Sequence, residues 1–206
     1  MSQIATGLRA FLNNPKLYDF FQDLMGARTG RRELIHQHVR PVAGDRILDI
    51  GCGTGRILDY LPAVEYFGFD LSQRYIDDAV RRYGPRGHFK CSLVEQMTVD
   101  EMAPFDIVLA AGLLHHLDDR QASDLMRLAG SALRQGGRLV TIDPCYANGQ
   151  SAASRFLVGR DRGQNVRSPE QYRELASAAF PDSHVSGQVK HRSWIPYTHW
   201  IMECQK

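Results

Sequence analysis

Cysteine, lysine and long apolar runs are all scarce in this chain of 206 residues. The cysteines are Cys52, Cys91, Cys145 and Cys204, and no two of them form a Cys-x-x-Cys pair. A zinc centre needs closely spaced ligand pairs, and a secreted disulfide scaffold needs more cysteine in a shorter chain, so both are disfavoured. Buried free thiols fit this pattern better.

Apolar residues never form the run of about 18 that a membrane-spanning helix needs. The first residues, MSQIAT, also lack the basic and then apolar pattern of a secretory signal peptide, so we expect a cytoplasmic protein. The formal net charge is only +2, from 25 basic and 23 acidic side chains. This balance does not indicate a nucleic-acid-binding protein, which would carry a clustered basic face.

What the chain does have is an alternation of short apolar strands and helices. The predicted strands cover residues 46–50, 65–70, 88–91, 105–110, 138–143, 183–194 and 196–204. The predicted helices cover residues 4–12, 15–25, 30–39, 72–83, 120–134 and 169–179. Such alternation indicates an α/β fold with a mostly parallel sheet, helices on both faces and an antiparallel hairpin at the C-terminal edge. The length suits one domain over residues 1–206.

The first predicted strand ends in the glycine-rich segment Asp49-Ile50-Gly51-Cys52-Gly53-Thr54-Gly55. Glycine lets the backbone turn sharply and lets a ligand approach without a Cβ in the way. Carboxyl ends of strands are where open α/β sheets bind ligands. The spacing is G-x-G-x-G, whereas dinucleotide-binding folds carry G-x-G-x-x-G.

Two carboxylates accompany this loop. Asp49 lies two residues before the first glycine, where it would repel a pyrophosphate but attract a ligand cation such as a sulfonium or an ammonium. Asp70 ends the second strand, where a carboxylate can accept hydrogen bonds from both hydroxyls of a ribose. Its alternative role is to cap the following helix, although Ser72 is better placed as that cap.

Together, residues 49–55, 68–70, 105–112 and 133–143 resemble the motifs of the class I, Rossmann-like S-adenosylmethionine (SAM)-dependent methyltransferases. The resemblance covers residues 44–144. It implies a seven-stranded sheet whose last strand is antiparallel, with SAM as cofactor. In that family an Asp often follows the third strand and flanks the adenine, whereas this chain has Ser92-Leu93-Val94 there. The resemblance and the loop together give a predicted cofactor site of Asp49, Gly51, Cys52, Gly53, Gly55, Asp70, Leu71, Ser92, Leu93, Ala111 and Gly112.

The fourth strand is followed by Leu114-His115-His116-Leu117. Methyl transfer from a sulfonium needs position and orientation, sometimes with a base for the acceptor's proton, and histidine is the natural base near neutral pH. We consider His116 first and His115 second as that base. Histidines here can instead hydrogen-bond the neighbouring backbone. We predict no metal site, because consecutive residues converge poorly on one ion.

Two segments are predicted to cover the carboxyl end of the sheet. Residues 1–40 would form a helical lid, and residues 145–168 form a connection long enough to be functional. We call residues 145–168 the cap. Its basic side chains would bind a carboxylate or phosphate, or else form a solvated face. The predicted substrate-binding residues are Tyr18, Gln22, Arg155, Arg162, Arg167 and Tyr197.

The sequence therefore predicts an enzyme that transfers a methyl group from SAM to a small molecule, possibly an acid. The chain lacks the Asn/Asp-Pro-Pro-Tyr motif of enzymes that methylate base amino groups, which disfavours a nucleic-acid substrate. Two alternatives stay open: a non-catalytic partner protein with this fold, and a nucleotide-dependent oxidoreductase. The glycine spacing and Asp49 disfavour the oxidoreductase.

Overall fold

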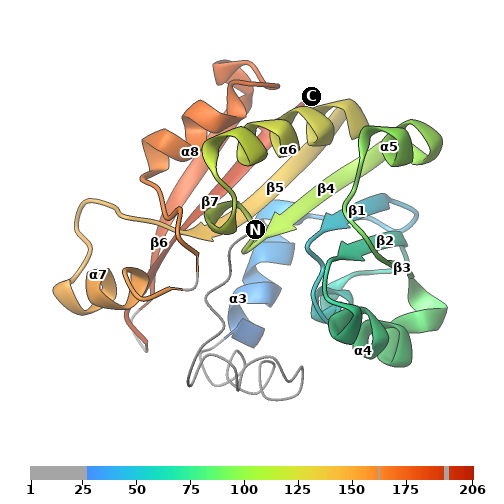
Figure 1. Ribbon diagram of the computed structural model, residues 1–206, viewed down its shortest axis with the longest axis horizontal. Coiled ribbons are helices and arrows are strands. Elements are labelled where there is room, and N and C mark those ends of the chain that lie inside the picture. The colour runs from blue at the N-terminus through green and yellow to red at the C-terminus, as the bar shows by residue number, and fades with distance from the viewer. Residues whose placement is uncertain (1–26, 162, 193–194) are drawn as a thin grey trace.

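A computed structural model describes residues 27–161, 163–192 and 195–206 (Figure 1). The helices expected at residues 4–12 and 15–25 lie outside these ranges. Three of the predicted substrate-binding residues, Tyr18, Gln22 and Arg162, also lie outside them.

Seven strands form one sheet in the order β3-β2-β1-β4-β5-β7-β6. Strands β1 to β5 pair in parallel, whereas β7 runs antiparallel to both β5 and β6. The strands are β1 (Arg46–Ile50), β2 (Glu65–Asp70), β3 (His88–Cys91), β4 (Phe105–Ala111), β5 (Leu133–Pro144), β6 (Val185–Arg192) and β7 (Tyr197–Gln205). The predicted Rossmann-like sheet with its antiparallel C-terminal hairpin is confirmed.

Helices connect the strands. The α-helices are α3 (Ala27–Leu34), α4 (Gln73–Tyr83), α5 (Gln96–Met102), α6 (Asp119–Ala132), α7 (Ala152–Val158) and α8 (Pro169–Ala176). Short turns of other helix types are η1 (Ile35–Val39), η2 (Arg56–Tyr60), η3 (Gly84–Arg86), η4 (Leu114–His116) and η5 (Asp182–His184). Sequence periodicity missed α5 and α7, because seven residues are too few to establish a helical period. Within the described ranges, no helix is long and apolar enough to cross a membrane.

Local capping explains where two of these helices begin. At the start of α6, the Asp118 side chain accepts the backbone N–H of Gln121, and the Gln121 side-chain oxygen accepts the backbone N–H of Asp118. Ser168 and Gln171 make the same reciprocal pair at the start of α8. Such boxes satisfy N–H groups that the first helical turn leaves unpaired. They therefore fix the two helices that follow η4 and the cap.

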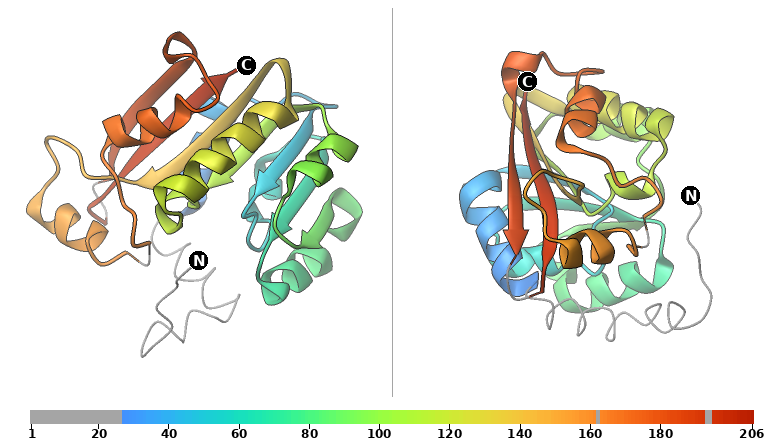
Figure 2. Two further views of the ribbon diagram at one scale, coloured as in Figure 1. Left: turned by 45° about the horizontal axis from the view of Figure 1, so that its top comes forward. Right: turned by 90° about the vertical axis from the view of Figure 1, so that its left-hand side faces the viewer.

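Both faces of the sheet are buried. Helices α5, α6 and α8 cover one face, with Met126 and Tyr172 in its core (Figure 2). Helix α3 and the turns η1 and η2 pack on the other face, with Ile35 in its core. Neighbouring residues of β1 alternate between the two cores, Leu48 facing the first and Ile47 the second. Burial on both faces explains why the parallel strands are apolar runs.

Candidate active site

The glycine-rich loop lies at the carboxyl end of β1, between β2 and β4. Its three glycines, Gly51, Gly53 and Gly55, have φ of 79°, 55° and 70°, a region that favours glycine. The N–H groups of Gly51 and Cys52 donate to the carbonyl of Phe69, at 2.8 and 3.0 Å, which fixes the loop against β2. A Cβ added to Gly53 would meet no described atom within 4 Å. The loop therefore leaves its backbone accessible to a ligand.

Asp70 ties the glycine loop to the start of α4. Its Oδ2 accepts the N–H of Gly53 at 3.0 Å, and its Oδ1 accepts the N–H of Ser72 at 2.8 Å. Ser72 occupies the N-cap position as predicted, but its hydroxyl makes no cap hydrogen bond. Burial raises the pKa of Asp70, and these backbone hydrogen bonds oppose the rise. Each carboxylate oxygen keeps a second lone pair that can accept a hydroxyl.

Asp49 is a buried carboxyl on β1. Tyr66 donates its hydroxyl to Asp49 Oδ2 at 2.5 Å. Burial raises the pKa of Asp49 to about 7, the Tyr66 hydrogen bond lowers it, and the charge of Asp70 raises it further. Such a carboxyl gains stability from a nearby cation, because an opposite charge favours the ionised form.

Apolar side chains frame the next part of this edge. Asp70 pairs with Cys91 in the sheet, so Leu71 and Ser92 follow neighbouring strand ends. Leu71 is 49% exposed and Leu93 is 55% exposed, which is unusual for large apolar residues. A flat apolar ligand group such as an adenine would cover such side chains.

The end of β4 borders the glycine loop. Gly112 has φ of 69°, and its N–H donates to the carbonyl of Ile142 at 2.8 Å. A Cβ on Gly51 would lie 3.4 Å from the side chain of Leu113. A Cβ on Gly112 would lie 3.9 Å from His115 Cε1. The loop and the histidine pair therefore belong to one edge of the sheet, next to Ala111.

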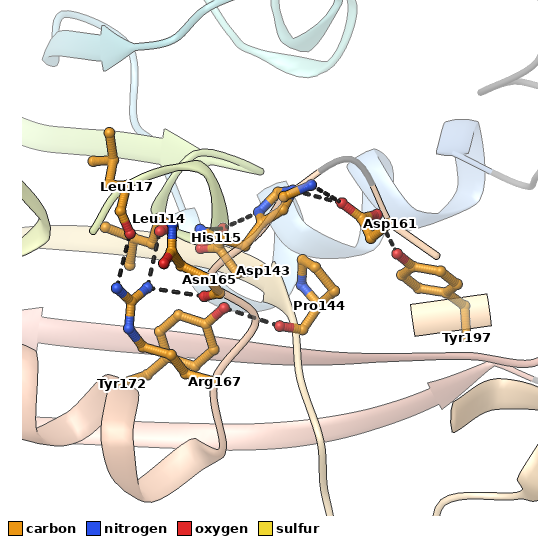
Figure 3. A network of polar contacts seen from close by, with 11 residues as sticks. Leu114, His115, Leu117, Asp143, Pro144, Asp161, Asn165, Arg167, Tyr172 and Tyr197 are labelled. Atoms are coloured by element: carbon orange, nitrogen blue, oxygen red, sulfur yellow. Dashed lines mark hydrogen bonds and ion pairs between the residues drawn. The ribbon is translucent and has the colours of Figure 1, made fainter. Parts of the chain in front are cut away.

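His115 lies buried between two carboxylates (Figure 3). Its Nδ1 is 2.7 Å from Asp143 Oδ1, and its Nε2 is 3.1 Å from Asp161 Oδ1. Burial lowers the pKa of His115, but the hydrogen bonds and charges of the two aspartates outweigh burial and raise it to about 9. His115 is therefore an imidazolium at neutral pH in this arrangement and has no free lone pair for a proton.

Asp161 is held from two sides. Its Oδ2 accepts the hydroxyl of Tyr197, and its Oδ1 also accepts the N–H of Gly163 at 2.8 Å. Burial would raise the pKa of Asp161, but His115, Gly163 and Tyr197 together hold it well below its usual range. The predicted substrate-binding Tyr197 thus contacts the cap's own carboxylate.

His116 takes a different position. It is half-buried, and its ring centroid lies 4.0 Å from that of His115. Both histidines therefore stand at the carboxyl end of β4, as the sequence predicted. Asp143 and Asp161 contact His115, the second of the two candidate bases.

Arg167 has a place that the sequence did not indicate. Its side chain is 7% exposed, and it donates to the carbonyls of Leu114, Leu117 and Asn165 at 2.8–3.0 Å. It also pairs with Asp119 at 2.8 Å. Every one of these partners belongs to the chain, so Arg167 joins the cap to η4 and the start of α6 (Figure 3). Its predicted role at a substrate stays a prediction, and its guanidinium is already bound by the chain.

The exposed arginines of the cap lie over aromatic rings. The guanidinium carbon of Arg155 is 5.4 Å from the ring centre of Tyr146, and that of Arg160 is 3.7 Å from the ring centre of Phe156. These contacts leave the charges in solvent. In the part of the chain that the structure describes, no three His, Cys, Asp or Glu side chains gather as metal ligands would.

Two partners of His115 were missing from the predicted site. Asp143 ends β5, and its position at a strand terminus was a usable signal. Asp161 belongs to the cap, and in the fold it reaches His115. That contact joins residues 46 positions apart, a distance over which no local sequence pattern operates.

The comparisons with known proteins agree with this geometry. A family model described as "Methyltransferase domain" matches residues 47–137. A ubiquinone biosynthesis O-methyltransferase from Idiomarina loihiensis is 25% identical over 82% of this chain and 75% of that protein. A trans-aconitate 2-methyltransferase from Pseudomonas aeruginosa is 30% identical over 79% of this chain and 64% of that protein.

Among solved structures, an O-methyltransferase family protein from Burkholderia thailandensis has a TM-score of 0.69 at 15% identity, covering 100% of this chain and 64% of that one. The chain spans 29% to 75% of the first curated relatives it matches. Residues 47–137 thus match a methyltransferase domain, and the sheet is that of the class I, Rossmann-like family of SAM-dependent methyltransferases.

SAM is the cofactor of this family, and the described residues fit it. The open backbone at Gly53 can take the methionine part, and Asp70 can accept the ribose hydroxyls. The buried carboxyl of Asp49 would gain a cation from the ligand, and Leu71 and Leu93 would supply apolar cover for the adenine.

Proposed function

We propose that this chain transfers a methyl group from SAM to a small-molecule acceptor bound beneath the cap. The observation that carries the proposal is the position of the glycine loop beside the histidine pair, at 3.4 Å from Gly51 to Leu113 and 3.9 Å from Gly112 to His115 when Cβ atoms are added. A cofactor bound at the glycine loop would then lie next to an acceptor bound at the histidine pair. SAM supplies an already activated methyl group.

The chain's own residues have distinct roles in this proposal. Gly51, Gly53 and Gly55 let the backbone approach the cofactor, and Asp70 fixes its orientation through the ribose. The cap excludes water from the acceptor site, and Arg167 holds the cap in place through buried hydrogen bonds. Orientation and exclusion of water are what a displacement on an activated methyl group needs.

Of the two histidines, His115 is better supported as the one that meets the acceptor, because its Nε2 faces the cap. Its raised pKa favours holding an anion over accepting a proton. His116 remains the candidate base. If it takes the acceptor's proton, His116→Ala should lower turnover by about 10²–10⁴ with nearly constant SAM affinity. Normal turnover in a less stable variant would assign His116 to the fold.

The acceptor class is also part of the proposal. One relative is named a ubiquinone biosynthesis O-methyltransferase and another a trans-aconitate 2-methyltransferase, which supports a small-molecule acceptor. The cytoplasmic location stays an expectation from the sequence.

Titration calorimetry tests the cofactor assignment. SAM and its demethylated product should bind, and NAD should not. Gly53→Val should abolish binding, because its side chain would occupy the open space beside the loop. Asp70→Ala should weaken binding by about 1.5–3 kcal/mol, the scale of hydrogen bonds to a charged group. The exposed Asp124→Ala is the matched control and should bind SAM as the parent does. Equal affinity in Asp70→Ala and Asp124→Ala would refute the ribose assignment.

A further inference from the structure

The body of the protein offers two donors that bind a carboxylate of the cap. His115 Nε2 meets Asp161 Oδ1 at 3.1 Å, and the Tyr197 hydroxyl donates to Asp161 Oδ2 (Figure 3). The two carboxylate oxygens of Asp161 thus face different donors, Oδ1 facing His115 and Oδ2 facing Tyr197. We call His115 Nε2 and the Tyr197 hydroxyl the carboxylate cradle. Two donors on one carboxylate give both strength and orientation.

The cradle does not depend on the cap for its shape. Asp143 holds Nδ1 of His115 at 2.7 Å and also accepts its backbone N–H at 3.2 Å. Asp143 is 1% exposed and pairs with Trp200 in the sheet, so this support is rigid. Tyr197 begins β7. Both donors therefore stay in place when the side chain of Asp161 rotates away.

Asp161 is the exchangeable member of this group. Its side chain is 23% exposed, against 1% for Asp143. Rotation toward solvent would hydrate its charge, which removes most of the cost of leaving. The imidazolium would then need another anion, because a buried unpaired charge is strongly unfavourable.

A neutral imidazole stands beside the cradle. Burial and the charge of Arg192 lower the pKa of His199 to about 4, so His199 adds no competing positive charge at neutral pH. Its ring centroid lies 5.0 Å from that of Tyr197. Within the described residues, His199 Nδ1 is buried and has no hydrogen-bond partner. A polar ligand beside Tyr197 could satisfy it.

The cradle also lies next to the cofactor edge. A Cβ built on Gly112 would lie 3.9 Å from His115 Cε1. Leu113, which follows Gly112, has its side chain 3.4 Å from a Cβ built on Gly51 in the glycine loop. An anion in the cradle would therefore sit beside the place proposed for the reacting end of the cofactor.

We propose that the acceptor is a carboxylic acid and that its carboxylate replaces Asp161 between His115 and Tyr197. The replacement exchanges one anion for another, so the imidazolium remains paired throughout. This inference rests on the proposed methyl transfer, and it moves the recognition of an acid from the cap arginines to the cradle. Asp161 is then a specificity-determining residue that occupies the site until the acceptor arrives.

Formate is the probe, because it is the smallest carboxylate and needs no knowledge of the acceptor. In Asp161→Ala, formate should bind saturably, raise the melting temperature and shift the ring resonances of His115 in NMR spectra. The parent protein should show the same shift only at higher formate concentration, since Asp161 competes with formate for the cradle. Adding Tyr197→Phe to Asp161→Ala should weaken formate binding at least about tenfold, as expected for a lost hydrogen bond to a charged group.

Three controls make the result decisive. Asp124→Ala, which removes an exposed carboxylate, should gain no formate binding. Formamide and chloride should not reproduce the effect of formate. Asp161→Ser shortens the side chain and also vacates the cradle, and it serves if Asp161→Ala does not fold.

Formate binding that is absent from both Asp161 variants, or unaffected by Tyr197→Phe, would overturn the inference. Because these measurements are made without SAM, they can fail while SAM binding succeeds. Failure of SAM binding with an intact formate response would instead overturn the proposed function alone.

Discussion

On the cofactor side of the sheet edge, Gly53 meets no described atom where a side chain would extend, and burial raises the pKa of Asp49 and of Asp70. On the cap side, His115 and Arg167 have their hydrogen-bonding groups bound by other parts of the chain. Open or destabilised polar groups indicate where a ligand will bind. Satisfied groups hold the structure until something displaces them.

The largest expected effect tests the statement that Arg167 on the cap side is a satisfied, structure-holding group. Arg167→Ala should lower the free energy of unfolding by about 1–3 kcal/mol for each buried carbonyl that loses its donor, which are those of Leu114 and Leu117. Chemical denaturation measures this loss. The exposed Arg155→Ala is the control and should change stability by at most about 0.5 kcal/mol. Equal, small effects would show that Arg167 does not secure the cap.

The pH dependence of stability tests the His115 cluster. The folded-state pKa of about 9 exceeds the ordinary 6.5, so the cluster's contribution is fully present below about pH 6.5 and is lost as pH rises through 9. The loss should be about 3 kcal/mol. The difference in unfolding free energy between the parent and His115→Gln should therefore shrink between pH 6.5 and 9. A constant difference would contradict a charged His115.

The smallest expected effect concerns Asp49, on the cofactor side of the sheet edge. Its folded pKa of about 7 lies above the ordinary 3.8, so an ionised Asp49 must be formed before it can pair with a ligand cation. SAM affinity should fall as pH drops below 7, by at most about tenfold per pH unit. Calorimetry between pH 5 and 7 measures the slope. Asp49→Asn should bind more weakly and with a flat profile, and a flat profile in the parent would refute this role.

Much of the fold could be predicted from local sequence. The strands at residues 46–50, 65–70 and 88–91 have the predicted bounds. Apolar runs specified β1 and β2 because most of their residues are at least partly buried, whereas β3 is an edge strand with no buried residue. The 12-residue β5 begins earlier than predicted, at Leu133. Leu133 pairs with Phe105 of β4, and the pairing resumes at Arg138 after a register shift over the Gly136-Gly137 turn. The terminal hairpin was predicted because two strand-like stretches follow each other closely.

The candidate site also contains some residues that local sequence could predict and others that it could not. Gly51, Gly53, Gly55 and Asp70 lie at strand ends within a few residues of one another or on adjacent strands, so a motif of short range could predict their grouping. Arg167 gave no such signal, because an arginine in a basic segment can equally contact solvent, substrate or buried carbonyls. Only the packing of the cap on η4 selects among these.

The sequence by itself determined the order of strands and helices, the glycine loop and the acids that accompany it, because each depends on backbone conformation and burial over a few residues. Only the tertiary structure decided that His115 is paired by Asp143 and Asp161, and that Tyr197 completes the cradle. These groups come from β5, the cap and β7. Their charges interact strongly only at distances of a few ångströms, which folding alone establishes.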